Sequence, residues 1–382
     1  MKLFSGQQAQ LSKHQKPQML KKIPYLQLFI FIIFAATILS GCNIVSPKTQ
    51  NKSATLLKTQ DAAQPQLLSE INRFAKVNSM RAKIDLKFED NSYAEQGIAE
   101  KYKTAPGELV VQRPANIFLK VQIPVLNSDI VQMTSNGEKF RIAVLEDGSG
   151  GKYRNFLIGT NNADYTILQE EVQKTELDNG KALKQNVNAF ANLRPQHFTD
   201  AVLVRPVDAE KFGYLQSTIV QEEEDLTSPK KSPLRRVLRG YYLLDEIRKN
   251  EDGSLQVLRR FWFDRVGSIR LARQQIFDAK GEIESDIIYG KEGNLTETGE
   301  YNNLPLEIVV TRPKEKYKMK ITYQSPTSVS IGKTYKATVF ELENSWKLPE
   351  VNLDDKVKEI RDRKAMNQNT ENPTQDTQTR SQ

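Results

Sequence analysis

The 382-residue sequence predicts an α+β fold that is mostly β, built on a strongly curved antiparallel sheet with helices on its concave face. Apolar residues recur at helical spacing in a few short stretches, and alternate with polar residues in several longer segments. Alternation means that each strand buries one face and exposes the other, which is typical of antiparallel sheets. A sheet of about a dozen such strands cannot stay flat, because strand twist curls it.

The first predicted element is a short amphipathic helix that begins at Leu67 and ends near Asn78. Its apolar residues Leu67, Ile71 and Phe74 share one face. Beyond it, the spacing of apolar residues changes from 3.6 residues, the repeat of a helix, to 2 residues, the repeat of a strand. The helix is therefore expected to pack on the sheet that follows. The residues that mark this alternation are Ala82, Ile84, Leu86, Phe88, Ile117, Leu119, Val121, Ile123, Tyr317, Met319, Ile321 and Tyr323.

Other strands are predicted where β-rich runs lie between turn sequences. These runs are 108–112, 129–134, 139–145, 153–158, 238–247, 255–264, 268–277, 283–289, 306–311, 316–323 and 334–342. Asn136-Gly137 is typical of a tight hairpin turn. A middle segment from about 164 to 203 has helical composition and ends in a helix that starts at Pro195. A further short helix is expected through Val357 and Ile360.

The N-terminus has the three-part layout of a secretory signal. A lysine-rich segment precedes an apolar core at 25–39, which is shorter than the ~20 residues that a membrane-spanning helix needs. Small residues then precede Cys42, the only cysteine of the chain. Cleavage after Gly41 therefore fits better than the alternative, an uncleaved anchor with a buried free thiol.

The domain organisation follows from these composition changes. We predict a signal peptide at 1–41, a flexible Ser/Thr/Gln/Lys-rich tether at 42–66, and one folded domain at 67–349. That domain contains a charge-segregated insert at 221–236, interpreted as a solvated loop, with a docking site for a protein partner as the alternative. A short helix and a disordered tail are expected at 350–382.

Composition argues against most enzyme classes. Loss of residues 1–41 removes five lysines and no acid, so the net charge falls from +8 to +3 and a nucleic-acid partner is not expected. One histidine, His197, remains, and the sequence around it predicts a helix-surface or packing residue. No G-x-S-x-G elbow or phosphate-binding loop is present. Asp264 and Glu307 are carboxylates that could pair in a hydrolase, but their spacing shows no dyad. We therefore predict no enzymatic activity, metal or cofactor.

Leu39-Ser40-Gly41-Cys42 resembles the lipobox of bacterial lipoproteins. In that family the cysteine thiol receives a diacylglycerol and the freed amino group receives a further acyl chain. The resemblance implies a membrane anchor at Cys42, because several acyl chains on one residue hold a protein essentially permanently. Residue 43 is Asn and not Asp, which by the same resemblance favours the outer membrane, with the domain facing the periplasm or, alternatively, the cell surface.

The order of the predicted elements resembles the Lol-pathway family of periplasmic lipoprotein carriers and outer-membrane lipoprotein receptors. The segments that carry the resemblance are 80–86 (MRAKIDL), 112–114 (QRP), the Asn136-Gly137 turn, 263–289 and 304–308. The resemblance implies an unclosed barrel whose apolar cavity binds lipid or the acyl chains of another lipoprotein. The side chains then expected to line the cavity are Ile84, Leu86, Phe88, Leu119, Val121, Phe261, Phe263, Met319 and Ile321. The alternative is an envelope scaffold of similar fold with a filled core, since alternation reports burial and not emptiness.

Overall fold

The computed structural model describes residues 53–90, 100–101, 104–124, 128–146, 151, 154–165, 167–168, 171 and 195–371. The predicted signal peptide, Cys42, the first part of the tether, most of the middle helical segment and the C-terminal tail lie outside these residues. None of the helices within the described ranges has the length and apolarity required to cross a bilayer.

The described elements are mostly strands. The strands are β1 (Thr55–Leu56), β2 (Ser79–Asp90), β3 (Glu100–Lys101), β4 (Ala105–Gln112), β5 (Asn116–Gln122), β6 (Asp129–Asn136), β7 (Lys139–Val144), β8 (Phe156–Thr160), β9 (Gly213–Glu224), β10 (Arg236–Lys249), β11 (Leu255–Asp264), β12 (Arg270–Phe277), β13 (Ile283–Gly293), β14 (Leu304–Arg312), β15 (Tyr317–Tyr323), β16 (Val329–Ile331) and β17 (Glu350–Asn352). The helices are α2 (Gln64–Ala75), α5 (Pro195–Val202) and α6 (Leu353–Glu371), with 3-10 turns η3 (Pro233–Arg235), η4 (Pro326–Ser328) and η5 (Ala337–Phe340).

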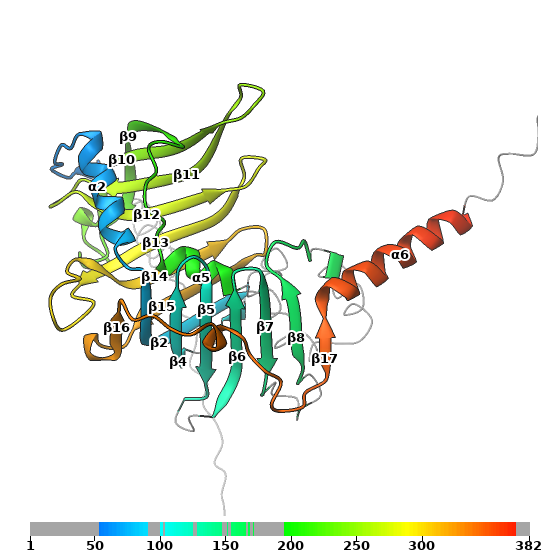
Figure 1. Cartoon of the computed structure of the whole chain (residues 1–382). Coiled ribbons are helices and arrows are strands. Elements are labelled where there is room, and N and C mark those ends of the chain that lie inside the picture. Colours follow the sequence, from blue (N-terminus) through cyan, green and yellow to red (C-terminus); the bar gives the residue numbers. More distant parts are fainter. Residues whose placement is uncertain are drawn as a thin grey trace, which may run out of the picture. The chain divides into compact units, whose positions relative to one another are not determined.

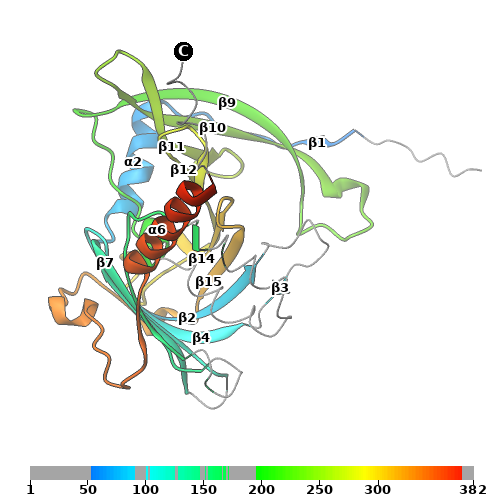
Figure 2. The ribbon, with the colours of Figure 1, turned by 90° about the vertical axis from the view of Figure 1, so that its right-hand side faces the viewer.

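All the strands belong to one strongly curved sheet (Figures 1 and 2). Following the pairings, the order is β9, β10, β11, β12, β13, β14, β15, β2, β4, β5, β6, β7, β8 and β17. Neighbours run antiparallel except for β17 beside β8 and the short β1 beside β10, which are parallel. β3 and β16 pair with parts of β2.

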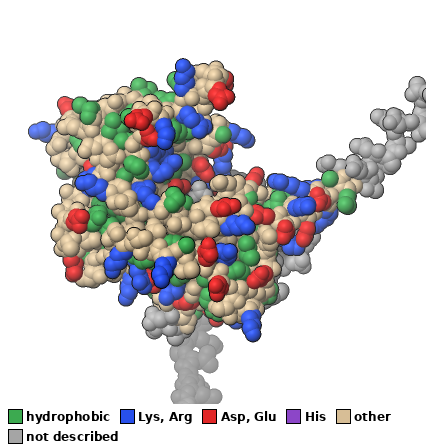
Figure 3. Space-filling model, in the orientation of Figure 1, with side chains coloured by type: hydrophobic (Ala, Val, Ile, Leu, Met, Phe, Trp, Pro, Cys, Tyr) green, Lys and Arg blue, Asp and Glu red, His purple; other side chains and the backbone are tan. Residues whose placement is uncertain are grey.

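Two helices pack on the concave face of this sheet. α5 contacts β4, β5 and β6 on one side and β14 on the other, so it lies inside the curve, and α2 contacts β12. The predicted class, a mostly β fold with an unclosed curved antiparallel sheet and helices on its concave face, is thereby confirmed. On the face shown in Figure 3, acidic and basic side chains are interspersed.

Registers explain why alternation predicted the strands well. On β2, Ile84 and Leu86 point to the core while Arg81 and Lys83 are exposed. Leu86 pairs with Ile321 of β15, and Leu119 of β5 pairs with Leu109 of β4, so buried residues meet buried residues across the ladders. The Asn136-Gly137 hairpin turn is also confirmed, with Gly137 at φ 92°, a conformation that favours glycine.

One predicted strand is absent, and one long strand, β9, was not predicted. The segment 334–342 contains no strand; instead η5 places Phe340, 1% exposed, against β5 and β6. Conversely, β9 was missed and its end was assigned to a loop at 221–236. Because β9 pairs with β10 and has almost no buried side chains, its sequence carries no apolar alternation. The predicted loop is thus the end of a hairpin, with residues 225–235 as its tip.

The predicted tether also ends earlier than expected. β1 pairs with β10, and Thr59 forms a bridge with Val266, so residues from Thr55 onward contact the folded domain. The first helix begins at Gln64 and not at Leu67, because Pro65 occupies its first turn, where a missing N–H costs nothing. The C-terminal helix extends to Glu371.

The outer face of β7 and β8 is covered as well. Ala143, Leu145 and Phe156 point away from the concave core and pack with Leu348, which belongs to the segment between η5 and β17. Asp354 at the start of α6 accepts hydrogen bonds from Thr160 Oγ1 at 2.8 Å and Tyr165 Oη at 2.5 Å. The C-terminal segment therefore reinforces this end of the sheet.

Candidate functional site

The residues predicted to line a lipid cavity all lie in the large core on the concave side. They are Ile84, Leu86, Phe88, Leu119, Val121, Phe261, Phe263, Met319 and Ile321, and none is more than 7% exposed. They form one continuous apolar surface with the buried faces of α2 and α5. Their contact with a lipid stays a prediction.

A small cleft lies where α2 and α5 meet the sheet. Its volume is about 20 Å³, and the ring centroids of Phe74 and Tyr289 at its wall are 5.2 Å apart. Its lining is apolar apart from the two tyrosine hydroxyls: Phe74, Val77, Met80, Ala201, Val202, Tyr289, Leu295, Leu304, Pro305, Ile308 and Tyr323. We call this the apolar cleft. A lipid-sized ligand needs ~300 Å³ or more, so the cleft as described is too small for one.

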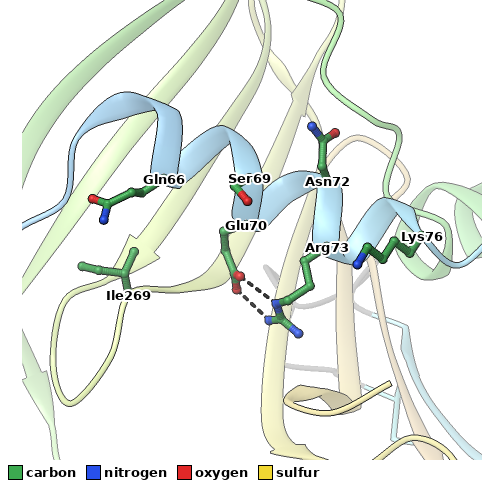
Figure 4. A pocket seen from close by; sticks show the side chains of 7 residues that line it. All are labelled: Gln66, Ser69, Glu70, Asn72, Arg73, Lys76 and Ile269. Atoms are coloured by element: carbon green, nitrogen blue, oxygen red, sulfur yellow. Dashed lines mark hydrogen bonds and ion pairs between the residues drawn. The ribbon is translucent and has the colours of Figure 1, made fainter. Parts of the chain in front are cut away.

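The exposed side of helix α2 carries polar residues that line a pocket (Figure 4), and two of them, Glu70 and Arg73, also fix the helix to the sheet. Arg73 forms a bidentate ion pair with Glu70, and both N···O distances are 2.7 Å. Arg73 also donates to the carbonyls of Asn302 and Asn303, at 2.9 and 3.1 Å, in the loop before β14. Glu70 in turn accepts the Leu271 N–H of β12 at 3.2 Å. The helix is therefore held over β12 and the β13–β14 loop.

Arg113, at the turn between β4 and β5, connects the ends of both helices. Its guanidinium donates to Ala75 O at 3.4 Å, at the C-terminal end of α2. It also donates to Leu203 O at 3.4 Å and Val204 O at 2.5 Å, directly after α5. A cation at two helix C-termini satisfies carbonyls that lack helical partners. Burial, followed by repulsion from Arg205 and Arg259, lowers the pKa of Arg113.

A second arginine holds the chain that leaves α5. Arg259 on β11 pairs with Glu246 on β10 through two contacts, one of them Nε to Oε1 at 2.7 Å. Both side chains are 2% exposed. Arg259 also donates to the carbonyls of Arg205 and Pro206, at 3.0 and 3.4 Å. Together with Arg113, it fixes residues 203–206 to the inner face.

Tyr214 forms a hydrogen bond to this buried ion pair, and the bond depends on the protonation of its hydroxyl. Its hydroxyl donates to Glu246 Oε2 at 2.8 Å, and burial, followed in part by this bond, raises the pKa of Tyr214 to about 12. A raised folded-state pKa means that the stabilisation is complete below the ordinary tyrosine pKa of about 10 and is lost as pH rises toward 12. We expect Tyr214→Phe to remove one phenol that titrates near pH 12 in a tyrosinate absorbance titration. An unchanged titration curve would contradict the assignment.

Other residues named from the sequence have structural roles. His197 is buried in α5, with Nδ1 hydrogen-bonded to the hydroxyl of Tyr317, so its prediction as a packing residue is confirmed. Asp264 is paired with Arg239 and Arg270, while Glu307 is paired with Lys291 and Lys320. Across the described part of the chain, no group of three His, Cys, Asp or Glu side chains is placed to hold a metal ion.

Sequence patterns did not indicate the apolar cleft or the contacts of Arg113 with the two helices. Arg113 was named only within 112–114, one of the segments that carry the family resemblance, and its partners at 75 and 203–204 are distant in the chain. The strand patterns predicted that several cleft residues are buried. They do not predict where α5 packs against those residues, because that depends on the loops that lead to α5.

Comparisons with known proteins add the following. No protein-family model and no curated protein sequence matches the chain. Similar solved structures include a LolA superfamily protein from Nitrosomonas europaea, with 9% identity, TM-score 0.38, and coverage of 74% of this chain and 99% of that one. A DUF1329 family protein from Desulfovibrio piger has 9% identity, TM-score 0.37 and coverage of 72% and 95%. A putative outer membrane lipoprotein-sorting protein domain from Vibrio parahaemolyticus has 7% identity, TM-score 0.34 and coverage of 72% and 95%.

Proposed function

We propose that this protein is a non-enzymatic outer-membrane lipoprotein, anchored through acylated Cys42, that binds lipid or the acyl chains of another lipoprotein on its concave face. The observation that carries the proposal is the apolar cleft between the sheet and two short helices. Arg113 holds both helices at their C-terminal ends through contacts to main-chain carbonyls. Such a protein would act in lipid or lipoprotein transport in the envelope.

Uptake requires α2 and α5 to move away from the strands. Breaking the Arg113 hydrogen bonds costs about 1.5–3 kcal/mol each at most, because they involve a charged donor. Burying an acyl chain of about 14 CH₂ groups gains roughly 0.8 kcal/mol for each, or about 11 kcal/mol relative to water. The three Arg113 hydrogen bonds together amount to about 4.5–9 kcal/mol, so an acyl chain can offset their loss. The contacts of Arg73 and Glu70 that hold α2 must break as well, and the helices can close again after release.

A photoactivatable fatty acid tests the binding site. The full chain, acylated and reconstituted in vesicles, is expected to form cross-links that a non-reactive fatty acid displaces and that map to α2, α5 and β14. Cross-links that do not saturate, or that map to the outer face of the sheet, would reject lipid binding at the cleft. Mass spectrometry of the N-terminal peptide tests the anchor, which Cys42→Ser should abolish.

Filling the cleft should reduce this cross-linking. Ala201 is fully buried and lines the apolar cleft, so Ala201→Trp places a large side chain where the acyl chain would enter. We expect a loss of cross-linking of about tenfold and a destabilisation of about 1–3 kcal/mol from overpacking. Ala201→Leu is the milder variant and should give an intermediate loss. Ala279→Trp, on an exposed turn, is the matched control and should bind as the unaltered chain does.

A second function, an envelope scaffold with a filled core, is favoured by the small volume of the cleft. Under that function the hairpin tip would dock a protein partner, and removing residues 225–235 would abolish partner capture. The same experiment separates the two functions, because a scaffold would show no saturable fatty-acid cross-linking in any variant.

A further inference from the structure

The tip of the β9–β10 hairpin, residues 225–235, exposes large apolar side chains. Leu226 is 78% exposed and Leu234 is 63% exposed. A third leucine, Leu56, lies on β1 beside Leu238, close to the same end of β10, and is 67% exposed. Single exposed leucines are ordinary on protein surfaces, but several at one end of a hairpin mark an interaction surface.

The charges around the tip are distributed unevenly. The acidic residues are engaged within the hairpin: Glu222 pairs with Arg236 at 2.7 Å, and Glu224 pairs with Arg235 at 2.9 Å. Asp225 accepts hydrogen bonds from Thr227 and Ser228. Lys230 and Lys231, at the turn itself, are exposed and form no ion pair with any residue in the described ranges. The outermost part of the hairpin is therefore cationic as well as apolar.

Thr55, the first residue of β1, lies at this same end of the hairpin. β1 runs parallel to β10, with Thr55 beside Val237 and Leu56 beside Leu238 (Figure 2). Because β10 begins directly after the tip, Thr55 is closer to the tip than Leu56 is. Cys42 and Thr55 are 13 positions apart. A chain of that length spans at most about 45 Å when fully extended. An anchor at Cys42 therefore keeps the tip within reach of the bilayer that holds it.

We propose that the β9–β10 tip contacts the surface of the membrane in which Cys42 is anchored. Leu226 and Leu234 insert among the lipid headgroups and upper acyl chains, while Lys230 and Lys231 pair with anionic headgroups. This inference rests on the proposed acylation of Cys42 but not on lipid binding in the apolar cleft. The contact fixes the orientation of the domain relative to the membrane plane. It also provides a second point of membrane attachment besides the acyl anchor.

An environment-sensitive fluorophore tests the contact on the full chain. Acylation blocks the thiol of Cys42, the only native cysteine, so Leu226→Cys and Leu234→Cys each provide one labelling site. The acylated chain is reconstituted in vesicles of phosphatidylethanolamine and phosphatidylglycerol that contain a lipid-borne quencher. We expect blue-shifted emission and strong quenching at 226 and 234. Leu255→Cys is the matched control and should be quenched weakly, because Leu255 is 69% exposed at the start of β11, beside Lys249 at the far end of β10.

Charge removal separates the electrostatic contribution. Lys230→Gln with Lys231→Gln should lower the ratio of membrane-bound to free tips by about fivefold for each lysine. Quenching at 226 that is no stronger than at 255 would overturn the proposal. Quenching that appears only after another envelope protein is added would also overturn it and would identify a protein partner. Failure of acylation is seen separately in the mass of the N-terminal peptide, and the lysine variants should keep saturable fatty-acid cross-linking.

Discussion

Replacing Arg259 by methionine is expected to lower the free energy of unfolding by about 3–5 kcal/mol, because the change leaves Glu246 buried without its partner. The same change removes the donor that satisfies the carbonyls of Arg205 and Pro206. Urea unfolding followed by circular dichroism measures the loss as a lower midpoint with an unchanged slope.

Two variants show whether the effect comes from the unpaired charge. Arg259→Met combined with Glu246→Leu should recover much of the lost stability, since apolar replacement of a buried pair is often neutral. Arg260→Met breaks the neighbouring pair with Asp245, which is partly exposed, and should cost much less because solvent screens it. Equal losses for Arg259→Met and Arg260→Met would contradict the importance of burial at Glu246.

Replacing Arg113 by methionine is expected to loosen both covering helices while the sheet stays folded. The variant loses hydrogen bonds to Ala75, Leu203 and Val204, so the closed state should be destabilised by about 1–3 kcal/mol. Hydrogen exchange should accelerate at amides of α2 and 195–206 while those of β5 and β14 remain protected. Fatty-acid cross-linking at the cleft should become faster by about tenfold or more, because the open state is more populated.

Suitable controls keep this result specific. Arg113→Lys retains the charge but not the forked geometry, so an intermediate effect is expected. Arg81→Met breaks an ion pair on the outer side of β2 and should leave both exchange and cross-linking unchanged. Uniformly faster exchange across the sheet in Arg113→Met would mean that Arg113 stabilises the whole fold and not the closed position of the helices.

Much of the fold could be predicted because a strand that buries one face alternates apolar and polar residues in its sequence. β11 was predicted at 255–264, the bounds that the structure has, because its inward residues Phe261 and Phe263 alternate with outward ones. β9 could not be found in this way, since a strand that buries neither face has no apolar period. The strand predicted at 334–342 failed because Phe340 of η5 is buried alone, while Ala337 and Val339 beside it are exposed.

The candidate site was less predictable than the fold. Alternation identified Ile84, Leu119 and Met319 as buried, and they are, but it contains no information on the space between the layers. The contacts of Arg113 arise only when the β4–β5 turn meets the ends of two helices from distant segments. Such a junction depends on loop paths, which apolar periodicity does not determine.

The two borders of the sheet have opposite characters. At one border, β8 is paired by β17 from the chain's own C-terminal region, with three residues in register. At the other border, β9 ends in the consecutive carboxylates of Glu222, Glu223 and Glu224. At the β17 border only three residues form the edge, and an edge this short gives a neighbouring copy little backbone to pair with. On a crowded membrane, where anchored copies meet often, this border resists extension of the sheet.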